Sequence, residues 1–226
     1  MPPVSEEITT DDLDAATQRA VEVLRGGGLA VLPTDTVYAL VADAFQTDAT
    51  QRLLAAKGRG RLYPVSIMIR NPRQVIGLAS DTPEIAERLM ASYWPGPVSI
   101  VLPEQPEMPW DLGNTEGAVT LRMPADDLLL AVAAEVGPLA CSGANLRGSP
   151  APTTLAAARE QLREAVDLYV DGGSREAPMT TVVDCTREVA HVLREGAVPA
   201  EDILTVAAGE IGWGQLPERR PDDEEF

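Results

Sequence analysis

The fold of this chain is decided at residues 30–40, which read Ala-Val-Leu-Pro-Thr-Asp-Thr-Val-Tyr-Ala-Leu. An apolar strand runs into Pro33, and the small polar residues Thr34, Asp35 and Thr36 follow before the chain turns apolar again. Polar groups at the end of a buried strand need hydrogen-bond partners that a packed core does not supply. Two interpretations stay open. The segment is either a ligand site at the strand's carboxyl end or a turn in which Thr34 or Asp35 caps the next element.

The composition is that of an ordinary globular chain, with 226 residues of which 45% are hydrophobic and 23% are charged. This length suits one large α/β domain or two small ones. No apolar run approaches the ~20 residues that a membrane span needs. The N-terminus lacks the basic start and apolar core of a signal peptide. We therefore expect a cytoplasmic protein that does not contact a membrane.

The scarcity of cysteine and histidine narrows the possible chemistry. Cys141 and Cys185 each lie in an apolar strand-like run, so we expect both to be reduced and buried. The single histidine, His191, also lies in such a run, and we expect a partly buried structural side chain rather than a catalytic one. No zinc-type ligand spacing exists, and the sequence assigns no metal ligand.

Acidic residues outnumber basic ones, and almost all of the basic residues are arginine. The formal net charge of −17 argues against broad, sequence-independent binding of nucleic acid. Of the 18 basic residues, only Lys57 is a lysine. This retention indicates that position 57 needs a compact ammonium group rather than a planar guanidinium. The alternative is chance survival of a lysine on a helix surface.

Apolar segments alternate with helical ones at first and cluster later in the chain, which predicts a mixed α/β sheet in a single domain. Helices are predicted to start near residues 9–12, 47, 71, 82, 126, 154 and 200. Strands are predicted at residues 29–32, 65–69, 98–102, 119–121, 139–141, 168–170, 181–184 and 189–193. We expect the domain to span residues 8–208 and residues 209–226 to form an acidic, disordered tail.

Several predicted strands end in polar segments, which we expect to converge on one pocket. This pocket would hold the basic residues Lys57, Arg59, Arg122 and Arg194 among hydroxyl groups and an amide. Such a mixture suits phosphates together with a carboxylate. The candidates for a general base are limited to Asp35, Asp43 and Asp184. Transfer of a phosphoryl or nucleotidyl group by positioning and charge neutralisation fits best, and neither a P-loop nor a Rossmann motif is present.

Short motifs also occur in a characteristic order along the chain. They are Pro33–Tyr38, Lys57–Arg59, Trp94–Pro97, Leu121–Pro124, Ala144–Asn145, Thr180–Asp184 and Leu193–Gly196. In this order they resemble the YrdC-like family of L-threonylcarbamoyladenylate synthases, over roughly residues 10–206. The resemblance implies a single-domain, twisted mixed α/β sheet, flanked by helices, around a concave basic cavity.

The resemblance further implies an activity and its partners. Family members combine L-threonine, bicarbonate and ATP, with Mg²⁺, into threonylcarbamoyl-AMP and pyrophosphate. Proteins of a threonylcarbamoyl-transferase complex accept this product, and tRNA receives the group indirectly, as threonylcarbamoyladenosine (t6A). Double-stranded RNA binding is implied as well. The chain resembles the short form without a C-terminal extension.

Site residues follow by matching motifs. The resemblance implies catalytic roles for Lys57 and Arg59, a threonine site of Thr36, Arg122, Gly143 and Thr180, and a nucleotide site of Lys57, Arg59, Asn145, Thr153 and Arg194. The chemistry agrees, because cations neutralise a triphosphate as pyrophosphate leaves and Arg122 can grip a carboxylate as a fork. Alternatively, Arg122 and Arg194 form salt bridges at strand ends, and Thr153 belongs to a helix cap with Thr154.

The chain departs from the family pattern at five positions. Gly143 stands where serine is usual and Arg147 where the family has a small residue. Ala39, Gly60 and Ala118 replace glycine, proline and threonine, respectively. These changes keep open a diverged paralogue that binds nucleotide or RNA without making the adenylate. A third interpretation is carbamoyl-adenylate chemistry of the kind found within larger maturation proteins, although no zinc-finger or acylphosphatase-like segment accompanies it here.

Overall fold

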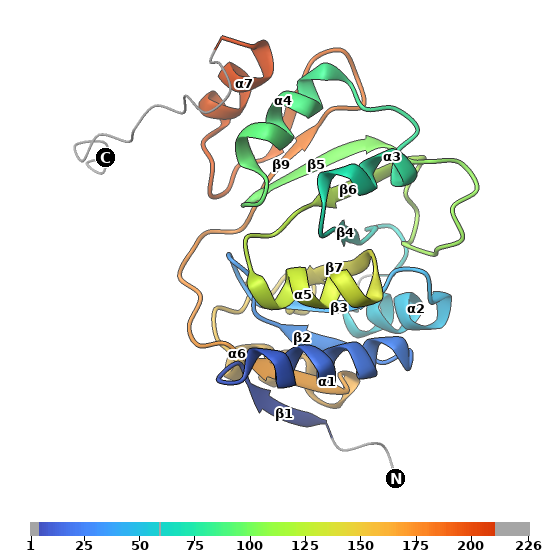
Figure 1. Ribbon diagram of the computed structural model, residues 1–226, viewed down its shortest axis with the longest axis vertical. Helices are drawn as coiled ribbons and strands as arrows, with labels where there is room; N and C mark the ends of the chain where they lie inside the picture. Colours follow the sequence, from blue (N-terminus) through green and yellow to red (C-terminus); the bar gives the residue numbers. More distant parts are fainter. Residues whose placement is uncertain (1–4, 59, 211–226) are drawn as a thin grey trace, which may run out of the picture.

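Figure 1 shows a computed structural model of the chain, which describes residues 5–58 and 60–210. Within these residues one mixed sheet has ten strands in the order β1-β8-β2-β3-β7-β4-β6-β5-β9-β10. The strands are β1 (Glu6–Thr9), β2 (Ala30–Leu32), β3 (Ala39–Asp43), β4 (Ser66–Met68), β5 (Val98–Pro103), β6 (Ala118–Arg122), β7 (Leu139–Gly143), β8 (Leu168–Asp171), β9 (Thr181–Asp184) and β10 (His191–Arg194). The predicted α/β fold with a mixed sheet is confirmed.

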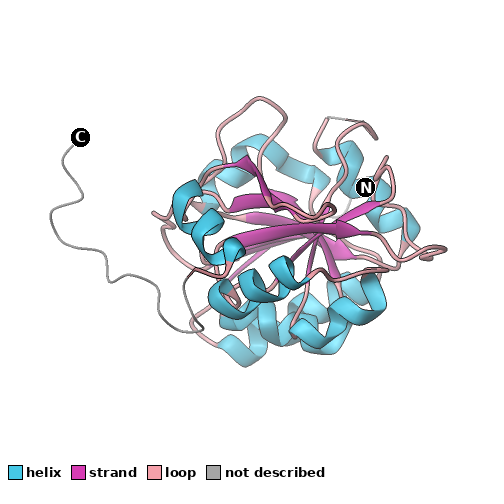
Figure 2. Ribbon diagram, turned by 90° about the horizontal axis from the view of Figure 1, so that it is seen from above, coloured by secondary structure: helices cyan, strands magenta, loops and turns pink. Residues whose placement is uncertain are grey.

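Helices lie on both sides of this sheet (Figure 2). They are α1 (Leu13–Arg25), α2 (Thr47–Ala56), α3 (Val75–Leu78), α4 (Glu84–Tyr93), α5 (Asp127–Val136), α6 (Leu155–Leu162) and α7 (Ala200–Ala208), with short 3₁₀ turns at Pro72–Gln74 and Arg163–Ala165. None of the described helices has the length and apolarity that crossing a membrane requires. The predicted domain bounds of 8–208 stay a prediction, and the predicted tail falls mainly on residues 211–226, outside the described residues.

Local sequence signals place most helix starts correctly. The Asp12 side chain accepts a hydrogen bond from the Ala15 amide at 3.0 Å and caps α1. Asp126 caps α5 in the same way, through the Leu129 amide at 3.1 Å. Strands β1 and β3 are missing from the sequence prediction. Glu6–Thr9 has no apolar run and forms β1 by parallel pairing with β8. Ala39–Asp43 forms β3 by antiparallel pairing with β2 and β7.

The register of the strands shows that one face of the sheet is apolar across most of its width. Residues paired from strand to strand share a face. The row on this face is Ala42, Ala140, Ile67, Leu121, Ile100 and Val183. All are buried, and they belong to the larger core, which also contains residues of α2, α3, α4, α6 and α7.

The opposite face changes character along the sheet. Over β2, β3, β7 and β8 it packs against α1 and α5 in a second apolar core. Further along, β4, β5 and β6 place Ser66, Ser99 and Arg122 on this face, because each alternates with a core residue. A packed core would not hold two serines and an arginine. The polar part of this face is therefore where a ligand can bind.

Residues 33–38 connect β2 to β3 as an antiparallel hairpin in which Leu32 pairs with Ala39. The element after the Thr-Asp-Thr segment is thus a strand rather than a helix. The polar segment stands at the end of β2, next to the polar part of the sheet face.

Candidate active site

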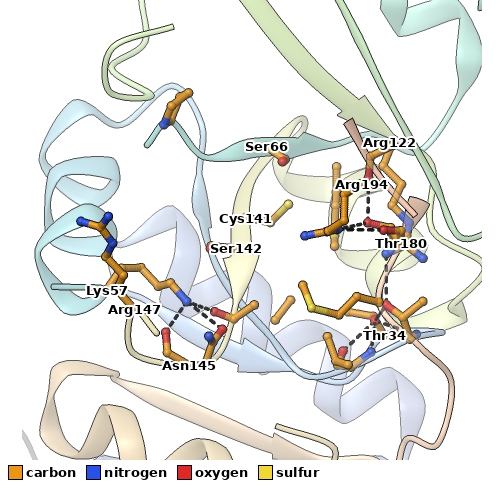
Figure 3. A pocket seen from close by; sticks show the side chains of 18 of the residues that line it. Thr34, Lys57, Ser66, Arg122, Cys141, Ser142, Asn145, Arg147, Thr180 and Arg194 are labelled. Carbon is orange, nitrogen blue, oxygen red and sulfur yellow. Dashed lines mark hydrogen bonds between the residues drawn. The ribbon is translucent and has the colours of Figure 1, made fainter. Parts of the chain in front are cut away.

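The polar strand ends converge on one cavity of about 360 Å³ (Figure 3). This volume lies within the ~300–1,000 Å³ range of small-molecule sites. Its lining includes seven of the residues named from the sequence, namely Thr36, Lys57, Arg122, Gly143, Asn145, Thr180 and Arg194. Thr153 is exposed and is not part of this lining. Arg59 lies outside the described residues.

Thr34 builds the turn at the end of β2. Its hydroxyl accepts hydrogen bonds from the amides of Thr36 at 2.9 Å and Val37 at 3.1 Å, and lies 2.7 Å from the Val37 carbonyl oxygen, to which it donates. This is the capped turn of the second interpretation. The side chains of its neighbours Asp35 and Thr36 both contact the Arg122 guanidinium. The capped-turn interpretation therefore applies to Thr34, and the ligand-site interpretation stays open for Asp35 and Thr36.

Arg122 stands at the end of β6 with 4% of its surface exposed. Its guanidinium forms an ion pair with Asp35 at 2.5 Å, donates from Nε to the Gly96 carbonyl at 2.9 Å and contacts the Thr36 hydroxyl at 3.4 Å. Burial lowers the pKa of Arg122, and the Asp35 carboxylate opposes this shift. Arg122 is thus both a salt-bridged residue and a wall of the cavity. The turn that follows Trp94 serves to supply its Gly96 acceptor.

Arg194 is directed toward the cavity by an irregularity in β10. Val192 pairs with Val183 on the apolar face, but the register then shifts and Arg194 pairs with Val182 on the opposite face. Without the shift, residues two apart in a strand would share a face. The guanidinium donates to the Thr180 carbonyl at 2.9 and 3.1 Å and to the Thr180 hydroxyl at 2.8 Å. Burial and the nearby Arg122 charge lower the pKa of Arg194.

Lys57, at the end of α2, is 2% exposed. Its ammonium donates to the carbonyl oxygens of Gly143 and Asn145 and, at 3.0 Å, to the Asn145 side-chain oxygen. Three donors on one small nitrogen suit these three acceptors, whereas a planar guanidinium does not. The burial shows that chance survival on a helix surface is the wrong explanation for this lysine. It holds the loop that follows β7.

Gly143 has a physical reason to lack a side chain. A Cβ atom built there would lie 2.8 Å from the Asn145 side-chain oxygen. That oxygen accepts from Lys57, while the Asn145 amide group donates to the carbonyl oxygens of Ser149 at 2.7 Å and Leu146 at 3.1 Å. A serine at 143 would therefore displace the Asn145 amide from its present position.

The cavity has two cationic ends (Figure 3). Lys57, Asn145 and Arg147 lie at one end, and Arg122, Arg194 and Thr180 lie together at the other. The grouping differs in part from the one implied by the resemblance. Gly143 lies at the Lys57 end through their hydrogen bond, and Arg194 lies at the Arg122 end.

Sequence reasoning missed several residues of the lining, chiefly Ser66, Ser99 and Cys141. Ser99 donates to the Thr180 hydroxyl at 3.2 Å. The available signal was a serine inside an apolar strand, which occurs in both β4 and β5. Cys141 and Cys185 are reduced and buried as expected.

Other candidates lie elsewhere. His191 is exposed, so the expectation of a partly buried side chain is wrong; β10 is an edge strand and, among residues 5–58 and 60–210, pairs only with β9. Asp43 accepts from the Phe45 amide and the Gln46 side chain, and Asp184 accepts from Thr186. Both carboxylates stabilise turns. Asp35, paired with Arg122, is the member of the predicted set that lies beside the cavity.

Comparison with known proteins gives a consistent result. The family model for Sua5, YciO and YrdC proteins, which carries the description "Telomere recombination", matches residues 22–196. A Mycobacterium leprae protein, named provisionally as a threonylcarbamoyl-AMP synthase, is 43% identical over 188 residues, covering 83% of this chain and 86% of the relative. A Pyrococcus abyssi protein named threonylcarbamoyl-AMP synthase is 36% identical over 194 residues, covering 85% of this chain and 57% of the relative.

Solved structures show the same similarity. The structure of Pyrococcus abyssi Sua5 complexed with L-threonine matches with a TM-score of 0.82 and 33% identity, over 90% of this chain and 60% of that one. This chain therefore spans less than two thirds of the length of that protein. It is similar to this group in both sequence and fold.

Proposed function

The chain belongs to the Sua5/YciO/YrdC family, and from this premise we propose that it is an L-threonylcarbamoyl-AMP synthase. It forms threonylcarbamoyl-AMP and pyrophosphate from L-threonine, bicarbonate and ATP, for the t6A modification of tRNA. The observation that carries the proposal is one cavity with a cationic group at each end and neutral donors between them. Such a cavity suits two anionic substrates that must meet head to head.

L-Threonine binds at the Arg122 end. The Arg122 guanidinium, oriented by Asp35 and Gly96, offers its remaining N–H groups to the amino-acid carboxylate. The Thr36 hydroxyl, which accepts from Arg122, and the Thr180 hydroxyl lie at the same end and supply uncharged hydrogen-bonding groups. The resemblance also gives Gly143 to the threonine site, but Gly143 lies at the other end of the cavity. Its lack of a side chain lets the main chain lie close to the Asn145 side chain.

ATP binds with its phosphates toward the Lys57 end. Lys57 and Asn145 form that end, and Arg59 lies two positions after Lys57 in the sequence. The carbamate on the threonine nitrogen must contact the α-phosphorus, so the α-phosphate lies between the two ends. Arg194, beside Thr180 and Arg122, is then the cation nearest that phosphate. Thr153 stays a prediction as a nucleotide contact.

We assign no side chain of the protein as an acid or a base in the reaction. Bicarbonate takes up a proton and loses water to give CO₂. The uncharged threonine amine then adds to the CO₂ carbon through its lone pair and releases one proton to solvent, which gives a carbamate. A carbamate oxygen then forms a bond to the α-phosphorus, and the bond to the β-phosphate oxygen breaks as pyrophosphate leaves. Lys57, Arg59 and Arg194 stabilise the charge that shifts onto the leaving group.

The resident residues do not fit a Mg²⁺ site of their own. Among the described residues that line the cavity, none is a carboxylate, and the described part of the chain has no group of three His, Cys, Asp or Glu residues placed to hold a metal ion. Mg²⁺ is usually bound through one or two carboxylates plus substrate phosphates. We therefore assign the metal no step. The acceptor proteins, double-stranded RNA binding and a cytoplasmic location stay predictions.

The proposal is tested by incubating purified protein with ATP, labelled bicarbonate and L-threonine. We expect pyrophosphate release that depends on threonine, together with a labelled adenylate of threonine. D-Threonine and the omission of bicarbonate serve as controls. Binding of ATP without threonine-dependent pyrophosphate release would instead support the diverged paralogue, for which Gly143 and Arg147 are the motivating residues.

A further inference from the structure

We propose that Arg147 is an additional polyphosphate-binding residue of this cavity, and that Tyr63 holds its side chain aside until the polyphosphate enters. The inference deepens the proposed function, because it takes the polyphosphate to be that of ATP. It concerns a residue at which this chain departs from the small side chain usual in the family.

The main chain of Arg147 is held at the Lys57 end of the cavity, whereas its guanidinium is free to change rotamer. Its amide donates to the Lys57 carbonyl at 3.2 Å, and Arg147 is part of the cavity lining. Figure 3 shows it on the same side as Lys57 and Asn145. The side chain itself is exposed, so rotation about its stem leaves the position of its Cα atom unchanged.

The partner of the guanidinium is a neutral tyrosine. The Arg147 guanidinium carbon lies 4.1 Å from the centre of the Tyr63 ring, and Nη2 donates to the Tyr63 hydroxyl at 2.5 Å. Tyr63 is itself 43% exposed. A cation–π contact and one hydrogen bond to an uncharged acceptor, both at an exposed site, are weak compared with the paired hydrogen bonds that an anionic phosphate accepts from a guanidinium. A phosphate can therefore displace the tyrosine.

Arg122 and Arg147 differ in how their charges are compensated. Arg122 at the far end is paired with the Asp35 carboxylate. Arg147 takes part in none of the ion pairs found among residues 5–58 and 60–210. Its positive charge is thus not cancelled by a bound acid. In a chain of net charge −17, such a charge offsets the repulsion that a triphosphate meets on approach.

A guanidinium also offers what the neighbouring lysine does not. The Lys57 ammonium already donates to three oxygens of the Gly143–Asn145 segment. The fork of Arg147 can form two parallel hydrogen bonds to one phosphate group. The competing explanation is a brace, in which Arg147 and Tyr63 only hold their two loops together. The brace and the phosphate ligand predict opposite effects of removing Tyr63.

The test measures the binding of inorganic tripolyphosphate by calorimetry and the KM values for ATP and L-threonine, in wild type and three variants. Arg147→Ser is expected to raise the Kd for tripolyphosphate and the KM for ATP by about 10-fold, and to change the KM for threonine by less than about 2-fold. Arg147→Lys keeps the charge but not the fork, and gives an intermediate Kd. Tyr63→Ala frees Arg147 and lowers the Kd for tripolyphosphate by about 2- to 5-fold.

Arg187→Ser is the matched control. Arg187 is an exposed arginine in the β9–β10 turn, at the opposite end of these strands from Thr180 and Arg194, and its loss should change the Kd by less than about 2-fold. Thermal unfolding of each variant confirms that it is folded.

Two results would overturn the inference. One is that Tyr63→Ala weakens tripolyphosphate binding as much as Arg147→Ser does, as a brace predicts. The other is that Arg147→Ser raises the KM for threonine as much as that for ATP. If wild type binds tripolyphosphate through Arg147 but releases no pyrophosphate with threonine, the proposed function fails and this inference stands.

Discussion

At the scale of single residues, the site depends on buried charges whose partners hold them in place. Lys57 and Arg122 are both almost fully buried, yet each meets acceptors from a different segment of the chain. A buried charge needs such partners to offset the loss of its hydration. The same contacts orient the charge toward the cavity. Stability and function are therefore coupled at these two positions.

Replacing Lys57 by Met tests the ammonium group while keeping the length of the side chain. We expect kcat/KM for ATP to fall by a factor corresponding to about 2–4 kcal/mol, because a preorganised charge is lost from the phosphate end. Lys57→Arg should not restore activity, since a fork does not fit the three oxygens around the ammonium. Pyrophosphate release provides the measurement. Near-normal activity in Lys57→Met would show that the phosphates bind elsewhere.

Replacing Asp35 by Asn leaves the buried Arg122 charge without its ion partner. We expect the free energy of unfolding to fall by about 3 kcal/mol, and kcat/KM for threonine to fall because the guanidinium loses its orientation. Asp111→Asn is a control, since its partner Arg61 is largely exposed and such a pair contributes only about 1 kcal/mol. Urea unfolding compares the two. Equal losses in both variants would argue against a special role for the Asp35–Arg122 pair.

At the scale of elements, the sequence allowed most of the fold to be predicted, and the exceptions have physical causes. Helix caps and apolar runs are local signals, so the starts of α1 and α5 and the positions of most strands are confirmed. Strand β1 has no apolar run and exists through pairing with β8. The shift in β10 that directs Arg194 toward the cavity depends on its pairing with β9, which no local pattern records.

The site was predicted less completely than the fold. The motifs predicted most of the charged residues that line the cavity. They did not show that Lys57 holds the Gly143–Asn145 segment or that Asp35 pairs with Arg122. These contacts join residues that are 86 to 88 positions apart in the chain. Their formation depends on the order of strands in the sheet. A single sequence does not give that order.

Gly196 follows β10 and lies against Thr180, at the Arg122 end of the cavity. A Cβ atom there would overlap the main chain of Met179 and Thr180. We expect Gly196→Ala to displace Thr180 from Arg194, to destabilise the protein by about 1–3 kcal/mol and to raise the KM for threonine. Gly77→Ala in α3 is the control, because a Cβ atom there meets open space and alanine favours a helix. An unchanged KM in Gly196→Ala would mean that Thr180 does not contact the substrate.

At the scale of the whole molecule, a single sheet supplies both a core and a site. One face is apolar across most of the strands, and the other is apolar only where α1 and α5 cover it. The polar remainder of that face carries the cavity. The charged residues proposed to bind substrates thus lie outside both apolar cores.

Three tyrosines make the stability of the fold decrease at alkaline pH. Burial raises the pKa of Tyr38, Tyr93 and Tyr169 from an ordinary value of 10 to about 12. Folding thus favours the protonated phenols. The stability that they contribute is complete below pH 10 and is lost as the pH rises toward 12. We expect absorbance at 295 nm to show these phenols ionising together with unfolding. Their ionisation near pH 10 in a folded protein would contradict the burial of all three.

The most direct test of the account is a crystal structure with L-threonine and an ATP analogue that cannot be cleaved at the α-phosphate. We predict the threonine carboxylate within hydrogen-bond distance of Arg122, and the phosphates running from Arg194 to Lys57 in the same cavity. A structure with either ligand outside this cavity, or with threonine at the Lys57 end, would contradict it.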